Sequence, residues 1–296
     1  MTKLLDLTDR HLRLLALLPA AVLLLTLTVY PVIELFRMAV SAISFVDAGI
    51  VREWALGANI QTFLDDWIYR RALLNTLIFV VASTSVELIL GLALALAVSE
   101  VVRGKGIVRT AMLLPILMPP VAIGSMWRLM YNSEFGVING LLAHVGLGPL
   151  DLLGSTSTAL LAVIIVDIWH WTPLVFLILL AGREALPAEV MEASTIDGAT
   201  YWQRLRFVIV PLMWPALVVA FVFRSIVAFK VFDQIFLLTS GGPGTASEVV
   251  SLYVYKVFFA QNRLGYGALL AIVTIAIICA YLGAFALAQR RLREKG

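Results

Sequence analysis

Three ionisable side chains stand inside long apolar runs of this sequence, where an isolated charge is costly. An ionised group within a membrane span costs about 2.5–3.5 kcal/mol on insertion scales, so it must be paired or hydrated. Such a group either locks helices together or hydrogen-bonds a polar solute. Each of the three is the only Asp, Glu, Lys or Arg of its run: Glu87 in Ala72–Ser99, Asp167 in Leu160–Gly182 and Arg224 in Phe207–Phe229.

Asp167 and Arg224 are expected to lie at the same depth. Asp167 is about seven residues inside its run and Arg224 about six, which at 1.5 Å per residue places both roughly 10 Å below the outer boundary. They are therefore predicted to be able to meet. The contact is either a purely structural pair or part of a cavity that hydrogen-bonds solute hydroxyls. Glu87 has no evident partner in the sequence and is expected to be structural.

The sequence lacks other reactive arrangements, such as paired carboxylates or a nucleophile beside a base. Cys279 is the single cysteine, so neither an intrachain disulfide nor a cysteine-based metal site can form. His170 has only His11 and His144 as companions and is not expected to bind a metal. No G-x-x-x-x-G-K-[ST] pattern is present. We therefore predict no catalytic residue, metal ligand or cofactor site, and no ATP hydrolysis by this chain.

The runs that carry these charges are predicted to be membrane-spanning helices. Hydrophobic residues make up 61% and charged residues 14% of the 296 residues, against about 45–50% and about 25% in soluble domains. About 20 apolar residues cross the hydrocarbon as a helix. The expected fold class is an all-α membrane protein. Its six candidate spans are Leu14–Ile33, Ala72–Ser99, Thr110–Trp127, Leu160–Gly182, Phe207–Phe229 and Leu264–Gln289.

The first span permits a second interpretation, because Lys3, Arg10 and Arg13 precede it as in a secretory signal. Its apolar core is longer than the 7–15 residues of a typical signal, so an uncleaved helix is predicted. The chain is then expected to consist of a cytoplasmic N-terminus at 1–13, one six-span domain at 14–289 and a basic cytoplasmic tail at 290–296.

Prolines interrupt two of the spans. A proline removes a backbone donor and bends a helix, and in lipid such a break survives only where protein or water satisfies the freed carbonyls. Both helices are therefore predicted to face their neighbours. The residues are Pro115, Pro119 and Pro120 in the third span and Pro211 and Pro215 in the fifth.

Basic residues indicate the orientation. With the N-terminus inside, the cytoplasmic segments hold the larger share of Lys and Arg, although Arg70 and Arg71 fall outside. Because basic residues favour the cytoplasmic side, both termini are predicted to be cytoplasmic. The turn formers at 239–244 then make an outer loop.

The cytoplasmic segment at 183–206 is predicted to be a helix–turn–helix on the inner surface. Pro187 suits a helix start, Glu189 complements the helix dipole, and Asp197-Gly198 signals a turn. Apolar residues such as Ile196 lie between its charges. The segment either packs on this chain or contacts a cytoplasmic partner.

This segment resembles the cytoplasmic EAA sequence of bacterial ABC-importer permeases. The matching residues are Glu192-Ala193-Ser194, then Gly198 after three residues, then Val208 and Val210-Pro211 after nine more. The usual third Ala is Ser194 here, and the usual Ile and Leu are both Val. The resemblance implies that the segment is a coupling helix that fits a cleft on an ATPase subunit. The implied contact residues are Glu192, Ala193, Ser194, Asp197 and Gly198.

Further motifs resemble the carbohydrate branch of these permeases, which includes maltose, trehalose, glycerol-phosphate and polyol permeases. The resemblance runs from about Leu14 to Gln289. The motifs are Asn75-Thr76-Leu77, Leu114-Pro115, Pro119-Pro120, Trp127-Arg128, Gly136-Val137-Ile138-Asn139, Phe232-Asp233-Gln234-Ile235 and Leu238-Thr239-Ser240-Gly241-Gly242-Pro243. The resemblance implies a type I ABC importer permease fold in a bacterial inner membrane. It also implies import of a sugar, a polyol or a sugar derivative.

The resemblance further implies the partners. They are a second permease subunit, two copies of a cytoplasmic ATPase that binds ATP and Mg, an external solute-binding protein and membrane lipid. No nucleic acid is expected. In maltose permeases the sugar is held just before the EAA segment and in the following span. The corresponding positions here are Asp167, His170, Trp171, Leu174, Arg224, Val227, Ala228 and Val231.

Trp171 offers an apolar ring face on which a sugar can stack, whereas Trp169 lies on a different face of its helix and is expected to pack. Two other functions are alternatives. A secondary carrier for a small polar solute would show inverted repeats, and no convincing repeat relates the two halves. A membrane-bound enzyme would need a reactive arrangement that the spans lack. A carrier would purify alone, whereas a permease would bring an ATPase with it.

Overall fold

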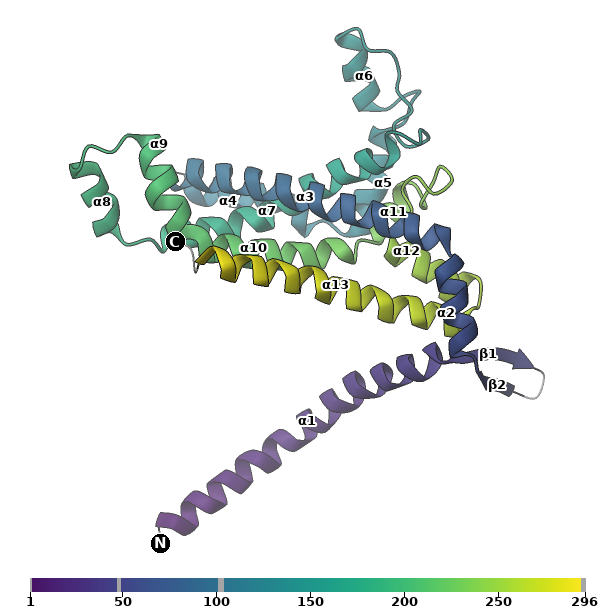
Figure 1. The fold of residues 1–296 in the computed structure, drawn as a ribbon. Coiled ribbons are helices and arrows are strands. Elements are labelled where there is room, and N and C mark those ends of the chain that lie inside the picture. Colours follow the sequence, from purple (N-terminus) through teal and green to yellow (C-terminus); the bar gives the residue numbers. More distant parts are fainter. Residues whose placement is uncertain (1, 47–48, 101–103, 294–296) are drawn as a thin grey trace. The chain divides into compact units, whose positions relative to one another are not determined.

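The structure is a computed structural model that describes residues 2–46, 49–100 and 104–293. Arg103 and residues 294–296 of the expected basic tail lie outside this range. The described chain is mostly helical and contains a two-stranded sheet (Figure 1). It divides into two units, which are described separately: residues 1–66 with 254–279, and residues 67–253 with 280–296.

The first unit contains a span and a small hairpin. Its elements are α1 (Thr2–Ala39), β1 (Ser41–Val46), β2 (Gly49–Trp54), α2 (Leu56–Asp65), a π-helical turn (Lys256–Ala260) and the first part of α13 (Leu264–Arg293). The strands pair antiparallel, with Ser41 opposite Trp54. Gly265 approaches the base of the hairpin so closely that a Cβ there would lie 1.9 Å from the Ser41 carbonyl oxygen. The Tyr266 hydroxyl donates to Asp66 at 2.5 Å, which ties α13 to the end of α2.

The second unit holds the main helical core. Its elements are α3 (Trp67–Glu100), α4 (Lys105–Leu117), α5 (Pro120–Met130), α6 (Val137–His144), α7 (Ala159–Glu184), α8 (Ala188–Ile196), α9 (Tyr201–Arg204), a π-helical turn (Leu205–Ile209), α10 (Val210–Phe229), α11 (Asp233–Leu238) and α12 (Val250–Tyr255). Helices α3, α7 and α10 pack side by side (Figure 1). Helices α8 and α9 lie at one end of this bundle, and α11 lies at the other end.

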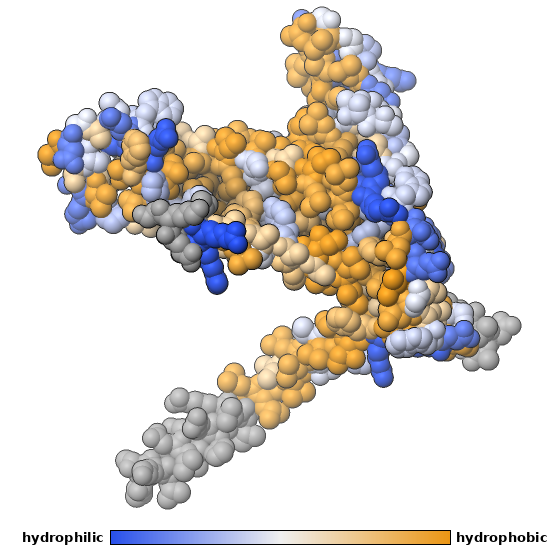
Figure 2. Space-filling model, viewed as in Figure 1, coloured by the Kyte–Doolittle hydropathy of each residue, from blue (hydrophilic) through white to orange (hydrophobic). Residues whose placement is uncertain are grey.

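The bundle is held together by fully buried apolar side chains and by close approaches at glycines. Phe176 and Leu179 of α7 are completely buried against α3 and α10. A Cβ on Gly91 of α3 would lie 2.7 Å from the Val175 side chain, so only a glycine lets α3 and α7 come this close. Apolar side chains cover much of the visible sides of the helices, and charged side chains gather around α8 and α9 (Figure 2).

The predicted spans agree with the structure in number when a bent pair of helices is counted as one span. Within the described residues, five helices are long and apolar enough to cross a membrane, and the bent pair brings the number to six. The observed spans are Ala16–Ala39, Trp67–Glu100, Gly106–Leu117 with Pro120–Met130, Ala159–Glu184, Tyr201–Phe229 and Leu264–Arg291.

The third span is broken rather than merely bent, because α4 and α5 meet at 89°. A residue before proline avoids the α conformation. Met118 and Pro119 both precede a proline, and both are extended, with ψ of 136° and 140°. The expectation that this span faces its neighbours holds for α5, whose Ile123 and Trp127 are buried. It fails at the break, where Pro119 and Pro120 are exposed in this chain.

The fifth span continues through its two prolines without a break. Pro211 and Pro215 cannot donate backbone hydrogen bonds, so two carbonyls of the preceding turns lose their α-helical donors. A π-helical turn, Leu205–Ile209, directly precedes α10, and Pro211 lies near the start of α10, where a proline is tolerated. The span Tyr201–Phe229 therefore counts as one helix by length and composition.

Candidate functional site

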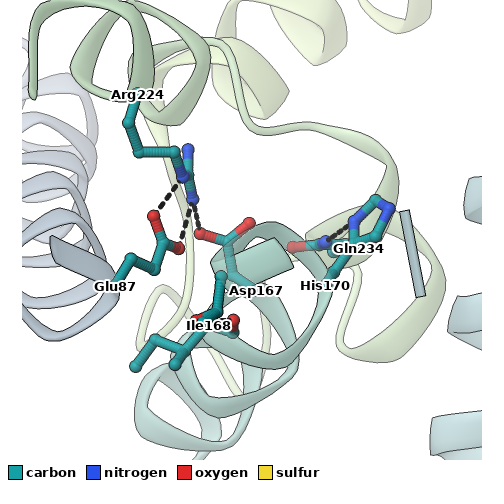
Figure 3. Close-up of polar contacts among 7 residues, drawn as sticks. Glu87, Asp167, Ile168, His170, Arg224 and Gln234 are labelled. Atoms are coloured by element: carbon teal, nitrogen blue, oxygen red, sulfur yellow. Dashed lines mark hydrogen bonds and ion pairs between the residues drawn. The ribbon is translucent and has the colours of Figure 1, made fainter. Parts of the chain in front are cut away.

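Arg224 of α10 is the centre of a buried charged cluster (Figure 3). Its Nε and Nη2 both donate to the Glu87 carboxylate of α3, with 2.9 Å from Nη2 to Oε1, and Nη2 also pairs with Asp167 of α7. Each of the three side chains is at most 2% exposed. The expected contact between Asp167 and Arg224 is confirmed. Glu87, whose partner was not evident from the sequence, pairs with Arg224.

The cluster joins the three helices of the core. Its two carboxylates share one guanidinium, so the cluster carries an excess of acidic groups. The Ser83 and Gln234 side chains also lie beside Asp167. Losing one partner of a buried ion pair typically costs about 3–5 kcal/mol, because the other charge is left unpaired. The cluster is therefore a strong constraint on how α3, α7 and α10 pack.

Aromatic rings of α7 pack near this cluster and against one another. The guanidinium carbon of Arg224 lies 5.3 Å from the centroid of the Trp171 ring, within the range of a cation–π contact. The His170 ring lies 5.1 Å from the Trp171 ring. Trp169 meets Trp127 edge-on at 5.5 Å. The expected packing role of Trp169 is confirmed, and one face of Trp171 is covered by Arg224.

A cavity of about 200 Å³ lies beside the cluster, between α7, α10 and the segment that follows α10. Of the eight residues predicted to line a solute pathway, Asp167, His170, Trp171, Val227 and Val231 line it. Arg224 lies behind Asp167, and Ala228 is completely buried. The lining residues that were not predicted to belong to the solute pathway are Pro120, Lys230, Phe232, Asp233 and Gln234.

The segment after α10 turns back into the bundle as the short helix α11. Its Gln234 and Ile235 are buried, and it packs on α5 and α7. The following Gly-Gly-Pro loop is held by α3: the Asn75 amide donates to three carbonyls, those of Thr245, Ala246 and Glu248, at 2.9–3.2 Å. The predicted loop at 239–244 is confirmed.

The predicted helix–turn–helix at the other end is also confirmed. Pro187 immediately precedes α8, and Asp197 follows its last residue. Gly198 has φ +72°, which an L side chain rarely adopts. Thr200 and Gln203 then form a capping box that begins α9. The Arg204 guanidinium donates to Thr195 at 3.1 Å and links α9 back to α8.

The exposed surface of α8 carries apolar side chains between charged ones. Ile196 is 86% exposed and Val190 38%, whereas Ser194 is buried and donates to the Met191 carbonyl at 2.7 Å. Glu192 lies beside Ile196 in an open groove. Of the two alternatives for the apolar residues of this segment, packing within the chain is excluded for Ile196. Among atoms of the described residues, none lies within 4 Å of a Cβ placed on Gly198.

An ion pair connects the broken span to this region. Arg109 of α4 donates to Glu184, the last residue of α7, at 2.5 Å. Both side chains are more than a third exposed, so the pair contributes little stability by itself. Within the described residues, no three His, Cys, Asp or Glu side chains come together in a way that could hold a metal ion.

Residues 87–294 match the family described as "Binding-protein-dependent transport system inner membrane component". The chain belongs to this family. The match covers the charged cluster, the cavity and the segment α8–α9 together. Because the family consists of membrane components of transport systems, it decides against the membrane-bound enzyme and the self-sufficient secondary carrier.

Several relatives of this permease are named as permeases of carbohydrate transport systems. It is 37% identical over 206 residues to the trehalose/maltose transport system permease protein of Thermococcus litoralis, and the aligned residues make up 70% of each chain. It is 32% identical to the sulfoquinovosyl glycerol transport system permease protein of Agrobacterium fabrum, over 93% of this chain and 89% of that one. The trehalose transport system permease protein of Mycobacterium tuberculosis is 33% identical, over 91% and 86%.

Solved structures share the fold of this permease. A bacterial ABC transporter for import of the acidic polysaccharide alginate superposes with a TM-score of 0.82 at 24% identity, covering 98% of this chain and 99% of that one. A bacterial alginate transporter in complex with an alginate pentasaccharide-bound periplasmic protein gives 0.83 at 22%, over 97% and 96%. The expected ABC-importer permease fold is confirmed.

Proposed function

We propose that this permease is one of two membrane subunits of an ATP-driven importer of a sugar, a polyol or a sugar derivative. An external solute-binding protein delivers the solute, and the chain forms half of the pathway. The observation that supports this most directly is the polar cavity beside Arg224, Asp167 and Trp171 in a chain whose relatives carry carbohydrate names. Both termini lie on the cytoplasmic side of a bacterial inner membrane.

Coupling to the ATPase is assigned to the segment α8–α9. Glu192, Ala193, Ser194, Asp197 and Gly198 belong to this surface, and the exposed Ile196 is a natural anchor for a cleft on a partner. Burial of one large aliphatic side chain at an interface is worth about 1.5–3 kcal/mol. This sequence has no G-x-x-x-x-G-K-[ST] phosphate-binding loop. In the proposed importer, two copies of the ATPase partner bind ATP and Mg.

The pathway is assigned to the cavity and to the predicted residues around it. Asp167, His170, Trp171, Val227 and Val231 line the cavity. The role of Arg224 is to hold Asp167 in place from within the core. Leu174 and Ala228 belong to the wall of the pathway rather than to the solute contact. When ATP closes the ATPase dimer, movement of α8 is passed through α7 and α10 to this cavity.

Purification from the native host tests the proposal. A tag on this chain should bring down a second six-span permease and an ATPase in detergent, identified by mass spectrometry. The purified assembly in proteoliposomes should import a carbohydrate only with ATP inside and the solute-binding protein outside. A chain that purifies alone and accumulates solute without ATP would refute the proposal.

A further inference from the structure

Gln234 has a polar side chain in a buried position. It is the second residue of α11, which turns back into the bundle, and it is only 4% exposed. It nevertheless lines the cavity together with Asp167 and His170. Figure 3 shows its amide beside the His170 ring and near Asp167.

The orientation of the Gln234 amide follows from its neighbours. Its nitrogen lies 3.1 Å from His170 Nδ1. An amide NH₂ only donates, and an imidazole nitrogen without a proton accepts. The NH₂ of Gln234 therefore donates to His170 Nδ1. His170 then carries its proton on Nε2, as a neutral ring with one remaining donor.

The other end of the same amide is unsatisfied. Oε1 of Gln234 is buried and has no hydrogen-bond partner within the described part of the chain. A buried acceptor without a donor is destabilising, because it has lost its hydrogen bonds to water and gained none in the protein. Such a group at the wall of a cavity is satisfied when a donor enters the cavity, as it is at a site that recognises a hydroxyl.

We propose that Gln234 is a solute-binding residue that accepts a hydrogen bond from one hydroxyl of the transported solute through Oε1. This inference rests on the proposed function and adds to it a residue on α11, outside the two spans to which the pathway was assigned. A hydroxyl both donates and accepts, so the same group can accept from His170 Nε2–H. A carboxylate at this position would face the acceptor Oε1 and the acidic Asp167. The subsite therefore selects a neutral hydroxyl group over an acidic one.

Uptake by the reconstituted assembly tests this subsite. The probes are radiolabelled trehalose, maltose, sorbitol, glucuronate and glucosamine, followed by analogues of the best imported probe that each lack one hydroxyl. Three assemblies are compared: wild type, Gln234→Met and Gln261→Met. Methionine at 234 keeps the length of the side chain but has no amide acceptor. Gln261→Met is the matched control, because Gln261 is an exposed glutamine. Initial rates are normalised to the amount of assembled complex, with the same solute-binding protein throughout.

The expected result is a specific coupling between one hydroxyl and Gln234. In wild type and Gln261→Met, one analogue should be imported about tenfold less efficiently than its parent. In Gln234→Met the import efficiency of the parent solute should fall to that of the analogue in wild type. The import efficiency of this analogue should be the same in Gln234→Met as in wild type. The solute-binding protein cannot produce this pattern, because it is the same in every assay.

Three outcomes would overturn the inference. Gln234→Met could discriminate against every analogue as wild type does, or the wild type could import glucuronate in preference to all neutral probes. If Gln234→Met does not assemble, Gln234→Asn replaces it, because the shorter side chain withdraws the acceptor and keeps the amide. Gln234→Asn must then lose the same discrimination between the parent solute and its analogue. Unchanged discrimination in Gln234→Asn would overturn the inference. Each of these results leaves the permease function standing. Purification without an ATPase would instead refute the proposed function and this inference with it.

Discussion

The guanidinium of Arg224 binds Glu87 through both Nε and Nη2, although the two residues are 137 positions apart in the chain. Asp167 shares the same Nη2. A planar guanidinium that meets a carboxylate with two donors is geometrically demanding. The pair thus fixes the rotation of α3 relative to α10, and Asp167 fixes α7 against both.

The first prediction concerns removal of the central charge. Arg224→Gln leaves two carboxylates buried without their donor, so the assembled complex should be destabilised by about 3–5 kcal/mol. The amount of complex recovered from membranes should fall strongly, and the midpoint of its thermal unfolding should drop. The exposed Arg128→Gln, at the end of α5, is a matched control and should change neither quantity.

Neutralising the whole cluster should then restore assembly. The double variant Asp167→Asn with Arg224→Gln still leaves Glu87 alone, so only the triple variant with Glu87→Gln should recover the level of complex. If assembly returns while uptake stays low, the cluster also serves the solute. Full recovery in the double variant would show that Glu87 does not depend on Arg224.

The sequence predicted the spans well, because length and the absence of charge are local properties. It also predicted the contact of Asp167 with Arg224, since depth can be counted along two successive antiparallel spans. It could not predict Glu87 as a partner, because α3 is not adjacent to α10 in sequence and nothing local specifies its rotation. The break at Met118 had a signal in the Pro119-Pro120 pair, which was interpreted only as a bend.

The part of the site that was missed lies on α11. This helix has only six residues, so neither its apolar length nor its periodicity marks it as part of the membrane domain. Its position depends on packing against α5 and α7, which are distant from it in sequence. Gln234 was part of a quoted motif, but its burial beside His170 becomes evident only in three dimensions.

Asn75 carries the second prediction, because its amide nitrogen lies within hydrogen-bond distance of three carbonyls in the loop after α11. Asn75→Ala leaves buried carbonyls without donors and should cost about 1–3 kcal/mol locally. Amide hydrogen exchange of residues 239–250 should accelerate, while exchange in α8 stays unchanged. A loop that remains as protected as in wild type would show that other contacts hold it.

The third prediction tests the coupling surface. Gly198→Asp introduces both a charge and a strained positive φ into the turn after α8, so the protein should insert normally but lose its ATPase during purification. Gly146→Asp is a matched control, because Gly146 also has positive φ and open surroundings but lies in the loop after α6. Normal ATP-dependent uptake by Gly198→Asp with the ATPase bound would refute the coupling assignment.

The last prediction is the orientation of the chain, which decides whether α8 can meet a cytoplasmic ATPase at all. In a Cys279→Ser background, Thr195→Cys should be labelled by a membrane-impermeant maleimide only in inverted vesicles, and Gly148→Cys only in right-side-out cells. Both positions are exposed. Gly148 is a better probe than Gly242, because the Gly242 carbonyl accepts a part-buried hydrogen bond from the Ser247 hydroxyl. A reporter fused after Gly296 should report the cytoplasmic side. Labelling of Thr195→Cys from outside would place α8 away from the ATPase, and the coupling assignment would fail together with the topology.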